Sequence, residues 1–406
     1  MSLYSKPLLS VDESDLQAFV ADQVRENMLL EYKRQLSIGS TGEKKEFLSD
    51  VSAFANSKGG YLIIGIEEAK GVPKVLSGIT IANPDEERAR LENLIRSGID
   101  PRIPGLEIAI VSLANGKHAI VIHIPQSWAK PHMVSLSGSR FYIRGSGGKQ
   151  PLDVREIRAA FELSGSARER VRDFRAERLT MIIAGQEPFP LDAPKTALHL
   201  IPLSIGNPDV AFDVSTIAED MGRQTNMFME YVPNTRGRYN ADGYFTYTCL
   251  AGDPPPPCSY LQVFHNGAIE GVEDASVGSL RILEGKSEIA IRSYENDLMG
   301  ALGVLLGHQR KLGVSPPILV TATLIGIADY TIEVSNRGFR IPDPFYKKTD
   351  HLIGKDPLIL PELLIESFNI EPSKVLRPLF DALWRASGYA SCPHYDKEGN
   401  RKPDGV

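Results

Sequence analysis

Hydrophobic residues in the first 165 positions recur at helical spacing in some segments and fill other segments continuously. Leu16 and Phe19 fall on one face of a helix. The run Tyr61–Ile66 (YLIIGI) is apolar throughout and predicts a strand buried on both faces. Asn115-Gly116 is a strong signal for a hairpin turn. The expected elements are helices over 10–27, 44–56, 85–97 and 154–163 and strands over 29–36, 61–66, 106–112 and 118–124.

The pattern changes after Gly165. Residues 167–179 carry five arginines among three acids, which is typical of a solvated connector helix with ion pairs; a stripe that contacts RNA is the alternative. From residue 189 on, prolines and aromatic residues become frequent. Here we expect strands over 244–250, 260–264 and 318–325 and helices over 293–311, 360–368 and 375–387. We therefore predict an α/β (α+β) chain in three parts: a mixed sheet with helices over 1–165, an arginine-rich connector helix over 166–188 and a second α+β domain over 189–406.

Composition and charge narrow the class of protein. A chain of 406 residues is too long for one ordinary core, and 42% hydrophobic and 24% charged residues are globular averages that exclude a disordered or fibrous protein. The net charge of −6 means that any surface for a polyanion must be local. No apolar run approaches the ~18 residues of a membrane helix, and the N-terminus has no basic region followed by an apolar core. We expect a soluble cytoplasmic protein without a signal peptide or membrane contact.

Three cysteines, all in the C-terminal half, are too few and too uneven for a disulfide framework, and they fit a reducing compartment. Cys392 and His394 lie close together, but no CxxC pair accompanies them, so structural zinc is disfavoured. The polar tail from Pro393 is expected to be frayed.

Acidic residues stand at the ends of two predicted strands. Glu26 and Glu31 bracket the start of the first strand, and Glu67-Glu68 follows the YLIIGI run. One helix links these strands, so we expect them to lie side by side and to bring the carboxylates into one cleft. Converging carboxylates would suit Mg²⁺ or Mn²⁺, which could activate water or a ribose hydroxyl and stabilise phosphodiester charge. Spacing alone leaves a second interpretation open, in which these acids are solvated residues at element ends.

Basic and aromatic residues are interleaved around these acids. Lys33 projects to the same face of its strand as Glu31, where it could neutralise phosphate charge. The glycine-rich segment 145–149 could approach a phosphate through backbone amides, although a flexible hairpin end is the plainer interpretation. Cations for phosphates and rings for unstacked bases are what an RNA-binding protein needs. The residues predicted to contact nucleic acid are Lys33, Arg34, Lys45, Arg140, Tyr142, Arg144 and Lys149.

Several motifs, taken in order, closely resemble the AlbA-like domain of the Schlafen family. They are LEYK at 30–33, VSAFAN at 51–56, GGYLIIGIEE at 59–68 and FYIRGS at 141–146. The family's usual form is a hydrophobic-Glu-Phe-Lys strand, an S-A-F-A-N helix end, a G-G-x-hydrophobic-hydrophobic-I-G-V strand followed by one or two Asp, and a closing x-Y-I-R-x-G-S. The resemblance covers roughly the first 165 residues, and it is specific because the motifs keep the family's spacing.

This resemblance implies an RNA-cleaving site with three carboxylates. Glu26 and Glu31 match the two glutamates of the RNA-cleaving members, and Glu68 stands where they have an aspartate. That departure moves the carboxylate by about one methylene. The implied function is a metal-dependent endoribonuclease for tRNA or another structured RNA, in antiphage or stress defence. Its catalytic residues and its ligands for Mn²⁺ or Mg²⁺ would be Glu26, Glu31 and Glu68.

Two other functions stay open. A non-catalytic transcriptional regulator would bind DNA or RNA with the same cations and keep the acids as structural residues. An ATP-binding sensor is disfavoured, because Gly285-Lys286-Ser287 ends like a P-loop but Leu280 replaces its first glycine, and we expect no organic cofactor. Animal members of the family close two such lobes around RNA, whereas one lobe is recognisable here, so a homodimer is expected.

Overall fold

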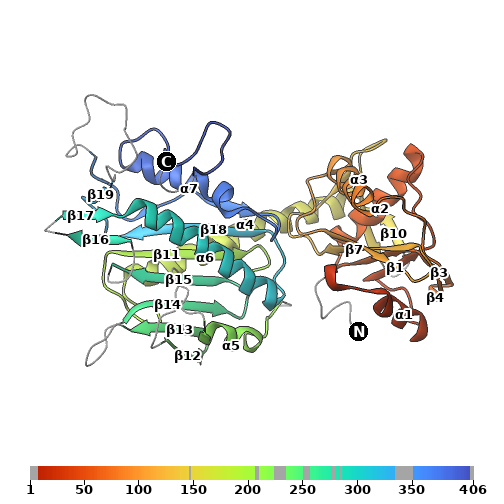
Figure 1. Cartoon of the computed structure of the whole chain (residues 1–406), viewed down its shortest axis with the longest axis horizontal. Coiled ribbons are helices and arrows are strands. Elements are labelled where there is room, and N and C mark those ends of the chain that lie inside the picture. Colours follow the sequence, from red (N-terminus) through yellow and green to blue (C-terminus); the bar gives the residue numbers. More distant parts are fainter. Residues whose placement is uncertain are drawn as a thin grey trace. The chain divides into compact units, whose positions relative to one another are not determined.

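The computed structural model describes residues 8–145, 148–205, 210–223, 235–249, 257–275, 279–283, 286–333 and 351–402 (Figure 1). By its internal contacts the chain divides into two compact units, residues 1–167 with 315–317 and residues 168–314 with 318–406. Helices and strands are mixed in both units, so the chain has the predicted α+β fold. Among the described residues, no helix combines the length and apolarity needed to cross a membrane.

The first unit is built on a four-stranded sheet with the strand order β1-β2-β7-β6, in which β1 runs parallel to β2 and the other neighbours are antiparallel. A second sheet has the order β10-β9-β8-β5, and β3 and β4 form a separate hairpin. The elements of this unit are η2 (Leu8–Ser10), α1 (Glu13–Ala21), β1 (Leu30–Lys33), α2 (Thr41–Asn56), β2 (Gly59–Ile64), β3 (Ile66–Ala69), β4 (Val72–Leu76), α3 (Pro84–Gly98), β5 (Ile99–Asp100), β6 (Glu107–Ser112), β7 (His118–Pro125), β8 (Met133–Val134), β9 (Arg140–Gly145) and β10 (Gly148–Pro151).

Helices cover both faces of the central sheet. Phe47 and Phe54 of α2 and Leu91 of α3 pack into one hydrophobic cluster with the sheet, and Leu16 and Phe19 of α1 pack into another on the opposite face. Burial on both faces explains why β2 is apolar at every position, as predicted.

Two predicted boundaries in this unit are wrong, and both affect the placement of acids. The side chain of Asp12 caps α1, which ends at Ala21 rather than near residue 27, so Glu26 lies in the segment that leads into β1. The predicted strand 61–66 is interrupted at Gly65, which has a φ of 107°. Glu68 therefore lies on β3, in a hairpin that leaves the sheet.

The predicted closing helix and connector helix form one helix, α4 (Val154–Ile183). Gly165 does not interrupt it, because a glycine inside a helix costs only about 1 kcal/mol relative to alanine. Phe161 makes an edge contact with the ring of Phe141. Farther along the helix, Leu179 and Ile182 join a hydrophobic cluster of the second unit.

The second unit contains an eight-stranded sheet in which β12, β13, β14, β15, β11, β18 and β20 follow one another and β21 also pairs with β18 (Figure 1). A smaller sheet has the order β16-β17-β19. The elements are β11 (Lys195–Pro202), α5 (Ser215–Arg223), β12 (Thr235–Asn240), β13 (Gly243–Cys249), β14 (Pro257–Phe264), β15 (Ile269–Asp274), β16 (Leu280–Leu283), β17 (Lys286–Ile289), α6 (Ile291–Leu312), β18 (Ile318–Ile325), β19 (Thr331–Ile332), β20 (Leu358–Ile359), β21 (Leu363–Ile365) and α7 (Pro372–Ala386).

Two predictions for the C-terminal region are wrong. The helix expected over 360–368 is absent, because residues 363–365 form β21 and pair with β18. The tail is described as far as Lys402 and is not frayed up to that point: His394 and Tyr395 are buried, and Tyr395 forms a bridge with Arg401. The predicted positions Ser146, Gly147 and Leu250 lie outside the described residues.

Candidate active site

The three predicted carboxylates come from three different local structures in the first unit. Glu31 lies on β1 and pairs in register with Leu62 of β2. Residues on β1 alternate between the two faces of the sheet, so Glu31 and Lys33 lie on the face covered by α2, whereas Tyr32 packs with α1. Glu26 precedes this strand, and Glu68 follows β2 on the β3–β4 hairpin.

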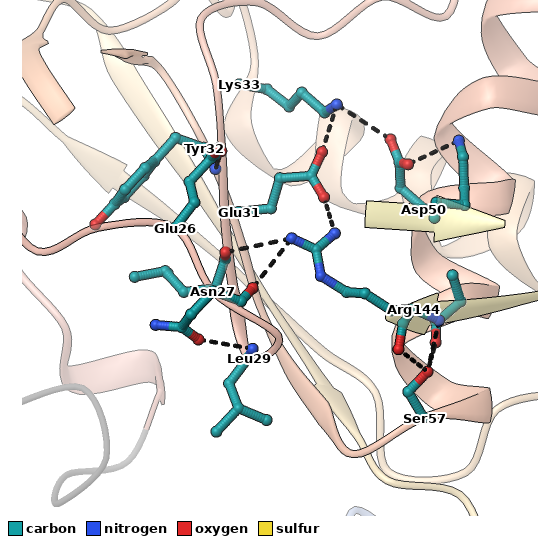
Figure 2. Close-up of polar contacts among 12 residues, drawn as sticks. Glu26, Asn27, Leu29, Glu31, Tyr32, Lys33, Asp50, Ser57 and Arg144 are labelled. Carbon is teal, nitrogen blue, oxygen red and sulfur yellow. Dashed lines mark hydrogen bonds and ion pairs between the residues drawn. The ribbon is translucent and has the colours of Figure 1, made fainter. Parts of the chain in front are cut away.

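Glu31 is held between two cations, as Figure 2 shows. The Lys33 ammonium lies 2.5 Å from one carboxylate oxygen, and the Arg144 guanidinium donates to the other. Arg144 also donates to the backbone oxygens of Asn27 (3.2 Å) and Leu30 (3.4 Å). Its side chain is only 9% exposed, so Arg144 holds Glu31 and the start of β1 rather than facing solvent.

A fourth charged residue, Asp50, belongs to this network and was not among the predicted site residues. Its carboxylate oxygen lies 3.4 Å from the Lys33 ammonium nitrogen (Figure 2). The other carboxylate oxygen lies 2.8 Å from the Lys149 ammonium nitrogen. The sequence does contain a signal for it: Asp50 falls on the same helical face as Phe47 and Phe54, where a charged residue needs a buried partner.

Glu26 and Glu68 are tied to one glycine of the β3–β4 turn. The Glu26 backbone N–H donates to the Gly71 oxygen (2.8 Å), and the Gly71 N–H donates to the Glu68 carboxylate (2.5 Å). A Cβ atom at Gly71 would lie 3.4 Å from a Glu26 carboxylate oxygen. The other Glu26 oxygen accepts from the backbone N–H of Tyr32 (2.8 Å). This turn therefore links Glu26 to Glu68 through the backbone of Gly71.

The pKa values of Glu26 and Glu31 are shifted in opposite directions. Burial raises the pKa of Glu26, the hydrogen bond from Tyr32 opposes that shift, and the negative charges of Glu31 and Glu68 raise the pKa further. Burial acts on Glu31 in the same sense, but Lys33 and Arg144 outweigh it and lower the pKa of Glu31. Glu31 is thus held ionised, while Glu26 binds a proton more readily than an isolated glutamate.

The carboxylate donors have the right chemistry for Mg²⁺ or Mn²⁺, but their arrangement does not fit a common ion. Among the residues that the structure describes, the oxygens of Glu26, Glu31 and Glu68 do not gather within 4.8 Å of one another. Both oxygens of Glu31 also have cationic partners already. A divalent ion with ligands at ~2.0–2.6 Å would require Lys33 or Arg144 to move away from Glu31.

The other residues predicted to contact nucleic acid differ in how accessible they are. Arg34 is 68% exposed and lies 3.2 Å from Glu67. Lys45 donates to the Ser137 oxygen (2.6 Å) at the surface, and Arg140 is exposed on β9. Tyr142 is partly buried below the Lys149 ammonium, 5.9 Å from its ring centre. Lys149 itself is 15% exposed, so Arg34, Lys45 and Arg140 are more accessible to a ligand than Lys149 and Arg144.

In the second unit, the side chains of Glu295, Cys392 and His394 gather within 4.8 Å. The Glu295 carboxylate accepts from Trp384 (2.9 Å), Cys392 (3.2 Å), His394 (2.8 Å) and Arg401 (2.7 Å). Arg401 balances the charge of Glu295, and the four donors anchor the C-terminal tail onto α6.

The mixed four-stranded sheet, the covering helices and the charged network around β1 define the first unit as an α+β domain with a charged site at its first strand. Residues 26–153 match the family model described as Schlafen, AlbA_2. This part of the chain is therefore a Schlafen AlbA-like domain, and the recognition from the sequence motifs is confirmed.

Other comparisons add little. The search of curated proteins found no match. A solved structure, that of the DIP2311 protein from Corynebacterium diphtheriae, is similar at 18% identity over 34% of this chain, with a TM-score of 0.25. The match spans only 26% of that protein's chain, and a similarity at this level supports no argument about fold or function.

Proposed function

We propose that the Schlafen AlbA-like domain binds structured RNA, with tRNA as the favoured substrate, and cleaves its phosphodiester backbone at Glu26, Glu31 and Glu68. The observation that carries this proposal is the placement of Glu26: the Gly71 backbone joins it to Glu68, and the charges of Glu31 and Glu68 add to burial in raising its pKa. A partly buried acid whose pKa is raised by neighbouring acids is typical of a catalytic site, whereas a solvated acid at the end of an element has no such neighbours.

The two pKa directions fit a division of roles. Glu26, with its raised pKa, is the proton acceptor: it takes the proton of the attacking water or ribose hydroxyl as the new bond to phosphorus forms. The bond to the leaving oxygen then breaks, and that oxygen takes a proton from solvent. Lys33 is 40% exposed and can stabilise the charge that develops on the phosphate. Arg144 is a positioning residue, which acts through Glu31.

Side chains of the chain carry out every proposed step, because the carboxylates as arranged do not fit a common metal ion. A requirement for Mn²⁺ or Mg²⁺ stays a prediction of the family resemblance. This metal requirement is testable, because an ion that binds Glu31 would have to displace the Lys33 ammonium or the Arg144 guanidinium.

The test is incubation of the purified full chain with total tRNA in Mn²⁺, Mg²⁺ or EDTA, followed by gel analysis of fragments. Glu26→Gln, Glu31→Gln and Glu68→Gln are compared with Glu92→Gln, an exposed glutamate of α3 outside the site. We expect discrete fragments from the wild type and the control, and a loss of at least about 100-fold in rate for Glu31→Gln.

Two results would contradict the nuclease. Intact tRNA that is shifted on a native gel, equally by the wild type and Glu31→Gln, would make the domain a binding module and favour the regulator. Cleavage that survives in all three variants would place the chemistry elsewhere.

Only one Schlafen AlbA-like domain is recognisable in this chain, so we also propose a homodimer in which two copies form the RNA cleft around a two-fold axis. Light scattering at micromolar concentration should give twice the mass of the chain. A monomer that still cleaves tRNA would remove the dimer from the proposal.

A further inference from the structure

A pocket of about 440 Å³ lies in the first unit, and its lining includes Arg34 and Glu67, the sequence neighbours of Lys33 and Glu68. It is formed where the chain leaves β1, by the loop that follows β4, by α3 and by the turn between β6 and β7. The carboxyl ends of the parallel strands β1 and β2 point toward this region, which is where open α/β sheets usually bind ligands. Its volume falls within the ~300–1,000 Å³ of small-molecule sites.

The wall of the pocket is fixed by the backbone. The Gly78 N–H donates to the Gly65 oxygen (2.9 Å), and Ile79 and His118 exchange two backbone hydrogen bonds (2.7 and 2.9 Å). Gly78 has a φ of 65°, and a Cβ atom there would lie 2.8 Å from the Cβ atom of Lys117. This close approach pins the loop 77–82 against the β6–β7 turn, so the pocket is already formed before a ligand binds.

Charge at the pocket favours an anion. Three cations line it, each from a different element: Arg34 after β1, Arg90 on α3 and Lys117 in the β6–β7 turn. Glu67 pairs with Arg34 (3.2 Å) and Glu87 pairs with Arg90 (2.7 Å), which leaves one positive charge in excess. Among the described residues, Lys117 has no carboxylate within 4.0 Å.

The surface of the pocket is mostly polar, but Leu36, Ile79 and Ile81 also line it and pack against the core of the first unit. Ser77 and Thr80 are further lining residues, and the Ser77 hydroxyl donates to the Gly65 backbone oxygen (3.3 Å). Apolar side chains that can contact a planar ring, together with cations for a phosphate, match a nucleotide.

The pocket also adjoins the acids in the sequence. Arg34 follows Lys33 directly, and Glu67 precedes Glu68. We propose that this pocket holds one nucleotide of the RNA strand next to the phosphate that is cleaved. This inference rests on the proposed function, because it gives the RNA strand its path away from the carboxylates.

Binding can be measured separately from cleavage. Fluorescence anisotropy in EDTA with a labelled single-stranded RNA, shown by gel to stay intact, gives the affinity of the full chain. The test variant is Arg90→Gln with Lys117→Ala, and the matched control is Lys74→Ala, an exposed lysine of β4 that does not line the pocket. Thermal unfolding checks that each variant is folded.

We expect the double variant to weaken RNA binding about tenfold or more and to lower the slope of log affinity against log salt by about 0.7 for each lost phosphate contact. Lys74→Ala should change the affinity less than about twofold. A second arm titrates the chain with free 5′-mononucleotides. If these bind more tightly than the RNA and compete with it, the pocket serves a free nucleotide and the strand proposal is overturned.

Failure of this inference and failure of the nuclease give different results. If tRNA cleavage depends on Glu31 but RNA affinity and cleavage are unchanged in the double variant, the pocket proposal is wrong and the nuclease stands. If no cleavage occurs but the double variant still weakens RNA binding selectively, the pocket stands without the nuclease. An equal loss in Lys74→Ala would reduce the effect to general surface charge and overturn the proposal.

Discussion

The carboxylates of Glu31 in the first unit and Glu270 in the second are both bound by an arginine. We call the network of Glu270 closed, because it is shut off from solvent, and the network of Glu31 open, because it is not. Glu270 is fully buried on β15 and accepts from Arg178 (2.8 and 2.9 Å) and Tyr260 (2.9 Å), and its oxygen lies 3.0 Å from His199. Burial would raise the pKa of Glu270, but Arg178 and His199 outweigh it and hold the pKa at about 2.

The network of Glu31 is open to solvent and to other acids. Glu31 is 12% exposed, its partner Lys33 is 40% exposed, and the charges of Glu31 and Glu68 reach Glu26. The closed network balances its own charge and stabilises the fold. The open network keeps one acid at a raised pKa, an arrangement that favours chemistry over stability. Under the proposed function, the same residue types serve different purposes in the two units.

The largest expected effect is on the closed network. Glu270→Ala leaves the buried guanidinium of Arg178 without its partner, so we expect the free energy of unfolding to fall by about 3–5 kcal/mol. Denaturant unfolding of the full chain measures this loss. Adding Arg178→Met should recover part of it, because the uncompensated charge is then gone. A loss under about 1 kcal/mol would mean that the network is not closed.

A smaller effect is expected for the arginine of the open network. Arg144→Ala should lower stability by about 1–3 kcal/mol, since Glu31 and two backbone oxygens lose a charged donor. Arg144 lowers the pKa of Glu31 and also that of Glu26, the proposed proton acceptor. Without Arg144 both pKa values rise, so the acid limb of the cleavage rate against pH should shift to higher pH. Arg144→Lys should restore part of that shift. A pH profile that does not move would leave Arg144 with a purely structural role.

The pH dependence of stability separates the two networks further. A carboxyl whose folded pKa is depressed stabilises the fold above its unfolded pKa, here about 4.5, and this contribution disappears as the pH falls toward the folded value of about 2. Between pH 6 and pH 3.5 the stability difference between the wild type and Glu270→Gln should shrink by about 1–1.5 kcal/mol. A constant difference across this range would contradict the depressed pKa of Glu270.

Some features of the site follow from the sequence, and others depend on contacts between distant residues. The strand that carries Glu31, the helix that ends at Asn56 and the buried run of β2 follow from hydrophobic spacing and from the family motifs. The inward direction of the Arg144 side chain does not follow from these patterns, because an arginine on a short strand can point to either the solvent or the core. Its partner Glu31 lies 113 residues away along the chain.

The sequence also could not predict the contact between Glu26 and the β3–β4 hairpin. Glu26 meets Gly71 only because α1 ends early and the chain turns back before β1. Helical spacing continues past Ala21 in the sequence, so it predicts a helix that runs too far. The ordered tail has a similar cause: a buried four-donor carboxylate, Glu295, holds residues whose local sequence is polar.

The smallest expected effect tests the open network most directly. Ionised Glu26 is destabilised by burial and by two nearby acids, so its raised pKa makes folding less favourable at neutral pH than at a pH below the unfolded value. Glu26→Gln removes the charge and keeps an oxygen that can accept from the Tyr32 N–H. Because Glu26 is only half-buried, solvent screening limits the expected gain in stability at pH 7.5 to about 0.5 kcal/mol.

The same substitution should abolish tRNA cleavage, since the proposed proton acceptor is gone. A variant that is slightly more stable and inactive is what a charged functional residue predicts, whereas an acid with a purely structural role would lose stability on replacement. Denaturant midpoints at pH 7.5 and pH 4, measured beside Glu92→Gln, decide between them. A gain that is present at pH 7.5 and smaller at pH 4 supports the open network. A loss at both pH values would assign Glu26 to the fold and leave the chemistry to Glu31 and Glu68.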